Sequence, residues 1–224
     1  MSLLIICPSR SRPEYLKKMI KSFVETSTVA HMVVRLDEDQ RELYAGVEAP
    51  ERVFLEYGPK VGPGGSINGS AYTNMVLSQE RNQMALRPYD AFCAAPDDAE
   101  FVTPGWDLYA LEVIKSFPGR IGVVSAAHGQ GTFLNYPCVS KEWINVLGWY
   151  AHPSIYHFCW DTMHELLGDA TSIVYAPKDK WLMEHQGLPQ EMGKYGVDCE
   201  AFLIWCVLER PQVVQRLRAA IANS

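Results

Sequence analysis

Short apolar runs alternate with segments of helical periodicity along the first part of the chain. Residues 3–7, Leu-Leu-Ile-Ile-Cys, form a continuous apolar run that ends before Pro8, as expected for a strand buried on both faces. Residues 13–25 then open on a proline and repeat apolar side chains at helical spacing. Further strands are expected at 31–36 and, more weakly, at 52–56. This alternation predicts an α/β fold with a mostly parallel sheet of βαβ units.

The remaining chain continues the pattern after one interruption. Residues 57–70 are rich in glycine and proline, so we expect a mobile loop there, suited to cover a site. The loop lacks the Gly-Lys-Ser/Thr ending of a phosphate-binding P-loop. The expected strands lie at 89–95, 121–126, 133–139 and 172–175, and the expected helices at 73–86, 106–117, 141–147, 161–167, 198–209 and 211–222.

Composition narrows the class of protein. The chain has 224 residues, 48% of them hydrophobic, which suits one α/β domain with a substantial core. A net charge of −6 argues against a basic surface for non-specific binding of nucleic acids. The six cysteines include no Cys-x-x-Cys pair and mostly lie in apolar runs, which indicates reduced, buried thiols. Because no segment resembles a signal peptide or a membrane span, we expect a cytoplasmic protein.

A pair of adjacent carboxylates is the strongest functional signal. Asp97 and Asp98 follow the apolar run 89–95, and a Pro-Gly turn and a helical segment come next. In α/β sheets, ligands bind outside the carboxyl ends of the strands. Neighbouring carboxylates repel each other unless a cation is near, and Mg²⁺ and Mn²⁺ prefer oxygen ligands that phosphate groups complete. The motif therefore predicts a metal-bridged nucleotide, and the alternative is a solvated acidic turn.

The order of several short motifs resembles the GT-A nucleotide-sugar glycosyltransferases, especially the family 2-like group. The motifs are Cys7-Pro8-Ser9-Arg10, Leu36-Asp37-Glu38-Asp39, Pro96-Asp97-Asp98, Gly105-Trp106-Asp107, Val139-Ser140-Lys141-Glu142-Trp143, Leu147-Gly148-Trp149, Trp160-Asp161-Thr162 and Glu184-His185. The resemblance covers about residues 3–198. It implies a GT-A (Rossmann-like), mostly parallel sheet flanked by helices in one domain, 1–224. Its expected parts are a nucleotide-binding half, 1–105, an acceptor and catalytic half, 106–197, and a C-terminal helical extension, 198–224.

The resemblance also implies a metal site, with one departure from the family pattern. The first position of the Asp-x-Asp motif is Pro96 here instead of Asp. Two registers are then open: Asp98 ligates the metal while Asp97 meets the ribose, or the motif occupies residues 98–100. We favour the first. The resemblance implies His185 as a further ligand of Mn²⁺ or Mg²⁺, and a neutral imidazole suits Mn²⁺.

By the same resemblance, the nucleotide lies at the ends of the first two strands. The implied contacts in the first loop are Pro8, Ser9 and Arg10. Arg10 is expected to approach the diphosphate, and the alternative is a plain polar turn with Arg12 exposed. Asp37 and Asp39 end the second strand, where acceptor-only carboxylates suit a base N–H or sugar hydroxyls. Lys194 is a further candidate for offsetting diphosphate charge.

Asp161 is the implied catalytic base, which takes the proton of the acceptor hydroxyl in an inverting transfer. The alternative for Asp161 is a helix N-cap. His157 and His164 flank it and are expected to be structural. Candidates for contact with the sugar or the acceptor are His128, Trp106 and Trp149.

Together these features predict a metal-dependent, inverting glycosyltransferase that uses a nucleotide-sugar, with a UDP-type donor favoured. The acceptor stays open between a glycan, a small molecule, a protein and a modified nucleobase. A nucleotidyltransferase is one alternative, although the loop 8–12 is not the glycine-rich basic loop of such enzymes. A non-catalytic module that binds nucleotide or glycan is another, because Pro96 replaces the first acid of the motif.

Overall fold

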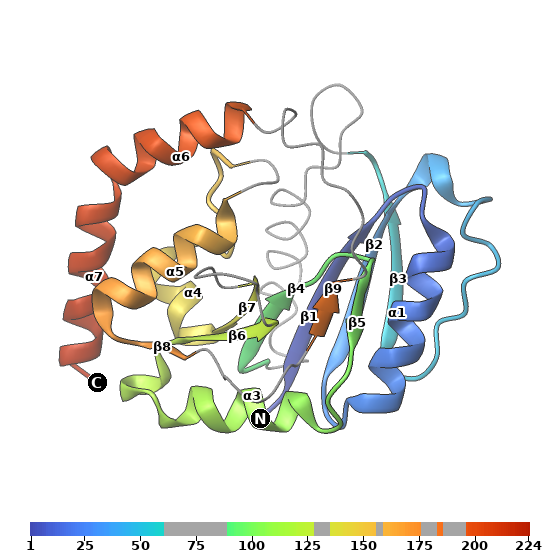
Figure 1. Cartoon of the computed structure of the whole chain (residues 1–224), viewed down its shortest axis with the longest axis horizontal. Coiled ribbons are helices and arrows are strands. Elements are labelled where there is room, and N and C mark those ends of the chain that lie inside the picture. Colours follow the sequence, from blue (N-terminus) through green and yellow to red (C-terminus); the bar gives the residue numbers. More distant parts are fainter. Residues whose placement is uncertain (61–88, 128–134, 156–158, 176–182, 186–195) are drawn as a thin grey trace.

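The computed structural model describes residues 1–60, 89–127, 135–155, 159–175, 183–185 and 196–224 (Figure 1). Several expectations fall outside these residues: the helix at 73–86, most of the glycine-rich loop, and the side chains of His128, His157 and Lys194.

A parallel block of four strands forms the first part of the sheet. Its members are β1 (Leu3–Ser9), β2 (His31–Asp37), β3 (Val53–Gly58) and β4 (Ala91–Ala94). They lie in the order β3-β2-β1-β4, and Ile5 of β1 is level with Met32 of β2 and Cys93 of β4. Because all four run the same way, their carboxyl ends meet at one edge of the sheet.

The sheet continues with strands of mixed direction. These are β7 (Asn135–Ser140), β6 (Val123–Ala127), β9 (Met183–His185), β5 (Ala99–Phe101) and β8 (Val174–Tyr175). Strand β7 is antiparallel to β4 and β6, β5 is antiparallel to β9, and β8 and β9 are parallel to β6. The mostly parallel α/β sheet expected from the sequence is confirmed, but β5 and β9 were not predicted, because three residues are too few to show a period.

Helices cover both faces of the sheet, as Figure 1 shows. One face packs against α1 (Pro13–Thr26) and α3 (Trp106–Ser116), and the other against α4 (Lys141–Leu147), α5 (Trp160–Thr171) and α7 (Arg210–Ala222). Leu3, Ile5 and Cys7 belong to the first core, whereas Leu4 and Ile6 belong to the second. Successive strand residues point to opposite faces, so burial of both faces explains the continuous apolar run.

The strand β1 runs on through Pro8 to Ser9, beyond its expected end. The carbonyl of Ile6 accepts a hydrogen bond from Ala95, so residues 6 and 8 turn their backbone groups toward β4. Strand β4 ends at Ala94, so the missing N–H of Pro8 removes no bond from the ladder.

The start of α3 is tied to the start of β2 by one buried carboxylate. Asp107 Oδ2 accepts hydrogen bonds from the backbone N–H groups of Thr28, Val29 and Ala30 at 2.8, 2.6 and 2.8 Å. Asp107 is fully buried. This single side chain therefore fixes the connection between α1 and β2, at the edge opposite to the one where the parallel strands end.

Sequence signals for helix ends are confirmed in α4. Ser140 Oγ accepts a hydrogen bond from the backbone N–H of Trp143, and Gly148 ends the helix with φ 87°. All six cysteines are free thiols. In the described part of the chain, no helix combines the length and the apolar character needed to cross a membrane.

The helix α6 (Gly196–Leu208) carries an apolar outer face. Its exposed large apolar residues are Val197, Leu203, Ile204, Val207 and Leu208. Trp205, on the opposite side, is buried in the second core. The sequence predicted a helix over nearly the same range, 198–209.

Candidate active site

Side chains from three strand ends meet at the carboxyl edge of the parallel block. The loop after β1 supplies Arg10 and Arg12, β2 ends in Asp37, and the loop after β4 supplies Asp97 and Asp98. Arg10 forms an ion pair with Asp37, and Arg12 forms ion pairs with both acids that follow β4. Residues up to 88 positions apart in sequence are thus brought into contact by the parallel topology.

Asp97 and Asp98, here called the acid pair, share one guanidinium. Arg12 Nη1 donates to Asp98 Oδ2 at 2.9 Å, and Arg12 Nη2 contacts Asp97 Oδ1. Both carboxylates are buried, with residue exposures of 0% and 3%, whereas the Arg12 side chain is 32% exposed. Arg12 therefore lies on the solvent side of the acid pair.

Burial makes the negative charge of the acid pair costly. It raises the pKa of Asp97 to about 6, although the Arg12 charge and the hydrogen bond from Ser9 lower it, and Asp98 adds to the increase. A nearby cation would stabilise the charged form of a buried carboxylate whose pKa is raised in this way. Groups with such perturbed pKa values cluster at functional sites. The acid pair is therefore a candidate site for a divalent cation.

A chain of hydrogen bonds joins the acid pair to the backbone of the first loop. Ser9 Oγ donates to Asp97 Oδ2 at 2.6 Å and lies 2.7 Å from the Tyr44 hydroxyl. Because Ser9 has a single hydroxyl proton, Tyr44 donates to Ser9. The backbone N–H of Arg12 in turn donates to the Tyr44 oxygen at 3.1 Å. Ser9 was predicted as a site residue, whereas Tyr44, in a segment without periodicity, was missed.

Arg10 pairs with the two carboxylates at the end of the second strand. It contacts the buried Asp37 and donates to both oxygens of the exposed Asp39, at 2.8 and 2.7 Å. The bonds to Asp39 and Asp37 raise the pKa of Arg10, and the bond from Arg10 lowers the pKa of Asp39. The sequence grouped these three residues at the nucleotide, and the structure brings them together. The guanidinium beside the acid pair is that of Arg12, for which the sequence favoured a functional role less than for Arg10.

A buried arginine, Arg35, lies on the same strand as Asp37. Arg35 donates to the carbonyl oxygens of Leu36 and Pro59 at 2.5 and 3.2 Å. Gly58 leaves room for it, because a Cβ at that position would lie 2.2 Å from Arg35 Nη2. Arg35 was not predicted as a site residue from the sequence.

The backbone of His185 lies next to the acid pair. The register of β5 and β9 sets His185 opposite Ala99, the residue that follows Asp98. The imidazole is outside the described part of the structure, so the metal role of His185 stays a prediction. Among the described side chains, no three His, Cys, Asp or Glu residues gather in one metal-binding group. The two carboxylate groups nevertheless fit a hard divalent cation, which prefers oxygen ligands.

Asp161 lies in the first turn of α5. The cap position is Cys159, whose φ is 72°, so Asp161 is not the N-cap that the alternative expected. One oxygen of Asp161 accepts the backbone N–H of Thr162 at 2.8 Å. Burial raises the pKa of Asp161, which suits a group that must take up a proton.

Tyr136 lies within electrostatic range of both Asp98 and Asp161. Burial raises the pKa of its hydroxyl, and the next causes are the negative charges of Asp98 and Asp161. Both carboxylates are therefore within electrostatic range of one phenol group. Tyr136 also adopts φ 49° within β7, a conformation that residues other than glycine rarely take. No pattern in the sequence marked Tyr136 as a site residue.

The two tryptophans predicted to contact the sugar or the acceptor, Trp106 and Trp149, pack against other aromatic rings. Trp106 is fully buried and stacks on Phe101, with ring centroids 4.8 Å apart and an interplanar angle of 27°. It has no open ring face for a sugar, so the expected stacking role is corrected to core packing. Trp149 is partly buried, and its ring meets His152 edge-on at 5.1 Å. His164 is buried and accepts a hydrogen bond from Trp143 Nε1 at 3.1 Å, which confirms its structural role.

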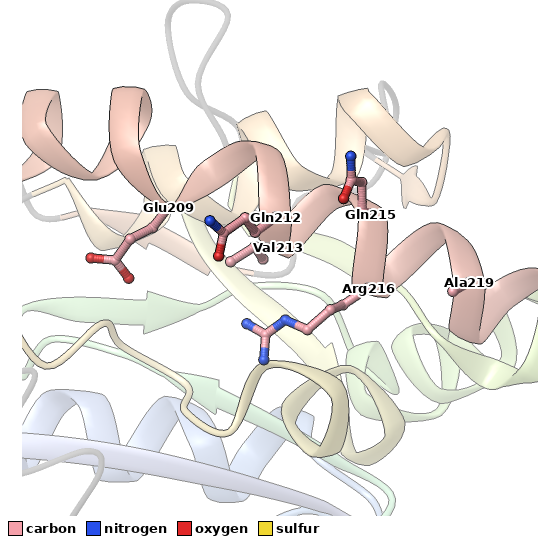
Figure 2. A pocket seen from close by; sticks show the side chains of 6 residues that line it. All are labelled: Glu209, Gln212, Val213, Gln215, Arg216 and Ala219. Atoms are coloured by element: carbon pink, nitrogen blue, oxygen red, sulfur yellow. The ribbon is translucent and has the colours of Figure 1, made fainter.

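A hollow of about 590 Å³ lies along the C-terminal helix α7 (Figure 2). Its lining residues are Glu209, Gln212, Val213, Gln215, Arg216 and Ala219. None of the site residues predicted from the sequence belongs to it.

Solved structures share this fold at low sequence identity. TarS from S. aureus has a TM-score of 0.59 and 14% identity, with 97% of this chain and 42% of that chain covered. A mutant Drosophila β-1,4-galactosyltransferase 7, in complex with manganese, UDP-galactose and xylobiose, has a TM-score of 0.52 and 14% identity, with coverages of 84% and 71%. The 4-diphosphocytidyl-2C-methyl-D-erythritol synthase of Anaerococcus prevotii has a TM-score of 0.50 and 8% identity, with coverages of 90% and 96%.

These similarities confirm the GT-A glycosyltransferase fold. No protein-family model matches the sequence, and no curated protein is significantly similar to it. The chain spans less than half the length of TarS.

Proposed function

We propose that this chain is a metal-dependent glycosyltransferase that moves a sugar from a nucleotide-sugar to a hydroxyl acceptor, with inversion at the anomeric carbon. A UDP-type donor is favoured. The observation that carries the proposal is the buried acid pair at the carboxyl edge of a parallel block, bridged by a single guanidinium. The galactosyltransferase with the same fold was crystallised with manganese and a UDP-sugar.

In this proposal the nucleotide lies over the ends of β1 and β2. Asp37 and Asp39 accept hydrogen bonds from the base or the ribose, with Arg10 holding both carboxylates in position. Pro8 and Ser9 line the same edge. Acceptor-only carboxylates suit hydroxyl and N–H groups of a nucleoside.

Asp98 would hold the divalent cation, with Asp97 in support and His185 as the expected further ligand. A bound Mn²⁺ or Mg²⁺ would offset the charge that develops on the departing diphosphate. Asp98 is assigned as the direct ligand because Asp97 already accepts the Ser9 hydroxyl. Both carboxylates present oxygen donors, which these cations prefer.

Asp161 performs the proton transfer in this scheme. The acceptor hydroxyl oxygen forms a bond to the anomeric carbon while the bond between that carbon and the diphosphate oxygen breaks. The electron pair of the broken bond leaves with the nucleoside diphosphate, and Asp161 takes the hydroxyl proton. The raised pKa of Asp161 supports this role, because a base with a higher pKa accepts a proton more readily.

A nucleotidyltransferase is the second candidate, favoured by the structural similarity to the 4-diphosphocytidyl-2C-methyl-D-erythritol synthase. In such an enzyme, an oxygen of the acceptor would form a bond to the α-phosphorus of a nucleoside triphosphate while the bond from that phosphorus to the bridging oxygen breaks, and pyrophosphate would leave. Measurement of the released product separates the two reactions directly.

The test is a thermal-unfolding screen of UDP-, GDP-, dTDP- and CMP-sugars with and without Mn²⁺. A donor at one hundred times its Kd stabilises the folded state by about 2.7 kcal/mol. We expect one class of donor to raise Tm only when Mn²⁺ is present. Asp98→Asn should lose this metal-dependent increase, whereas Glu112→Gln, which makes the same charge change on the exposed face of α3, should keep it.

Two results would contradict the proposal. Absence of a Tm increase with every nucleotide-sugar would reject the donor class. A full Mn²⁺-dependent increase in Asp98→Asn would reject the acid pair as the metal site. Stabilisation by nucleoside triphosphates with release of pyrophosphate would favour the second candidate.

A further inference from the structure

We infer that Arg12 is a displaceable counter-ion of the site. In the ligand-free protein it neutralises the acid pair, and on binding of metal and donor it moves from the acid pair to the diphosphate. This inference rests on the proposed function, because it concerns the same site.

The guanidinium of Arg12 lies between the acid pair and solvent. Arg12 contacts both members of the acid pair, at 2.9 Å for Asp98 and through Nη2 for Asp97. The two carboxylates are buried, whereas about a third of the Arg12 side chain, 32%, is exposed. A cation that approaches from solvent therefore meets Arg12 before it reaches the carboxylate oxygens.

The backbone of Arg12 is held by a hydrogen bond, whereas its side chain is partly exposed to solvent. Its N–H donates to the Tyr44 hydroxyl at 3.1 Å, and Arg12 occupies the cap position of α1, directly before Pro13. A displaced guanidinium must therefore move by side-chain rotation, which the long arginine stem permits. The N-terminus of the 14-residue helix α1 favours anions at the same place, so a diphosphate would meet two positive features.

Charge explains why displacement is required. One guanidinium offsets one of the two carboxylates, and a divalent cation offsets both. If Arg12 stayed in place beside a bound cation, two like charges would lie within a few ångströms of each other. A diphosphate removes that conflict, because it accepts hydrogen bonds from a guanidinium in the same bidentate way as a carboxylate. Metal and diphosphate binding are therefore coupled through Arg12.

Arg10 provides a matched control. It comes from the same loop and carries the same charge, but its partners are Asp37 and Asp39. Arg10→Gln removes one positive charge from the same loop as Arg12→Gln does, but it removes no contact with the acid pair.

The experiment compares Mn²⁺ affinity, read from the electron paramagnetic resonance signal of free Mn²⁺, in wild type, Arg12→Gln and Arg10→Gln. Without any anion, we expect Arg12→Gln to bind Mn²⁺ at least about tenfold more tightly than wild type. Arg10→Gln should stay within about threefold of wild type. With Mn²⁺ saturating, inorganic pyrophosphate should bind Arg12→Gln at least about tenfold more weakly than wild type.

Equal or weaker Mn²⁺ binding by Arg12→Gln would overturn the inference, as would unchanged pyrophosphate affinity. An equal gain in Mn²⁺ affinity for Arg10→Gln would also overturn it, because the effect would then be general electrostatics. If Arg12→Gln does not fold, Arg12→Lys tests the same point: its single ammonium bridges the acid pair less well, so Mn²⁺ should bind more tightly than in wild type. Nucleotide-sugar stabilisation in the same wild-type protein tests the proposed function separately, since it depends on donor binding rather than on the change at Arg12.

Discussion

Acid should destabilise this protein through His164, which lies one helical turn after the candidate base Asp161. His164 is fully buried, and its Nδ1 accepts the hydrogen of Trp143 Nε1 at 3.1 Å. Burial lowers the pKa of His164 from 6.5 to about 4. The neutral imidazole is therefore part of the packing that positions α5 against α4.

The direction of the pH effect follows from proton binding. Below pH 6.5 the unfolded chain protonates this histidine, whereas the folded protein keeps it neutral down to about pH 4. The unfolded state then binds more protons at this residue, so the contribution of His164 to the free energy of unfolding falls as the pH falls through this interval. The raised pKa of Asp97 acts in the opposite direction over part of the same interval, so the His164 effect is measured as a difference from a variant that lacks it. The slope is about 1.4 kcal/mol per pH unit, and the total loss by pH 4 is about 3 kcal/mol.

The assay is urea unfolding, followed by tryptophan fluorescence between pH 7.5 and 4.5, of wild type and His164→Asn. The asparagine Oδ1 can still accept the Trp143 hydrogen bond, but it does not titrate. At pH 7.5 the variant should be less stable by about 2 kcal/mol, because part of the ring volume is lost. Because the variant lacks this titration, its stability relative to wild type should rise as the pH falls, and the difference should shrink or reverse toward pH 4.5.

Nuclear magnetic resonance gives an independent reading of the same imidazole. The ring protons of His164 should stay those of a neutral histidine at pH 5.5. A midpoint near 6.5 for this residue, or identical pH slopes for wild type and His164→Asn, would refute the reasoning.

Three further outcomes are expected. Asp161→Asn should leave the donor-induced Tm increase unchanged and lower the transfer rate by at least about 100-fold, and a normal rate would reject the base assignment. Asp107→Ala should lower the free energy of unfolding in urea by about 3 kcal/mol, because three backbone N–H groups lose their acceptor, and a loss under 1 kcal/mol would contradict that role. Gly58→Ala should destabilise by about 1–3 kcal/mol, since the added Cβ would lie 2.2 Å from the held Arg35 guanidinium, and an unchanged urea midpoint would show that Arg35 moves freely.

The parallel block could be predicted because its strands carry strong local signals. Residues 3–7 are apolar on both faces, and the structure buries both faces under helices. The cap at Ser140 and the stop at Gly148 follow from side-chain and backbone chemistry alone. Strands β5 and β9 were missed because their stability comes from pairing across more than 80 residues, which no local pattern records.

The site was predicted in part, for a similar reason. The acids were recognisable because carboxylates at strand ends are chemically conspicuous. Their partners were not, since the choice between Arg10 and Arg12 depends on how the first loop turns at Ser11, whose φ is 62°. Trp106 was misassigned because an aromatic side chain next to a turn looks the same in sequence whether it packs inside or faces a ligand.

The most direct measurement of the central claim is a crystal structure of the protein soaked with Mn²⁺ and UDP, with anomalous data collected at the manganese edge. The account predicts an anomalous peak bound to the Asp98 carboxylate, with the Arg12 guanidinium on the diphosphate and away from both acids. UDP bound with Arg12 still bridging Asp97 and Asp98, and no manganese peak at the acid pair, would contradict it.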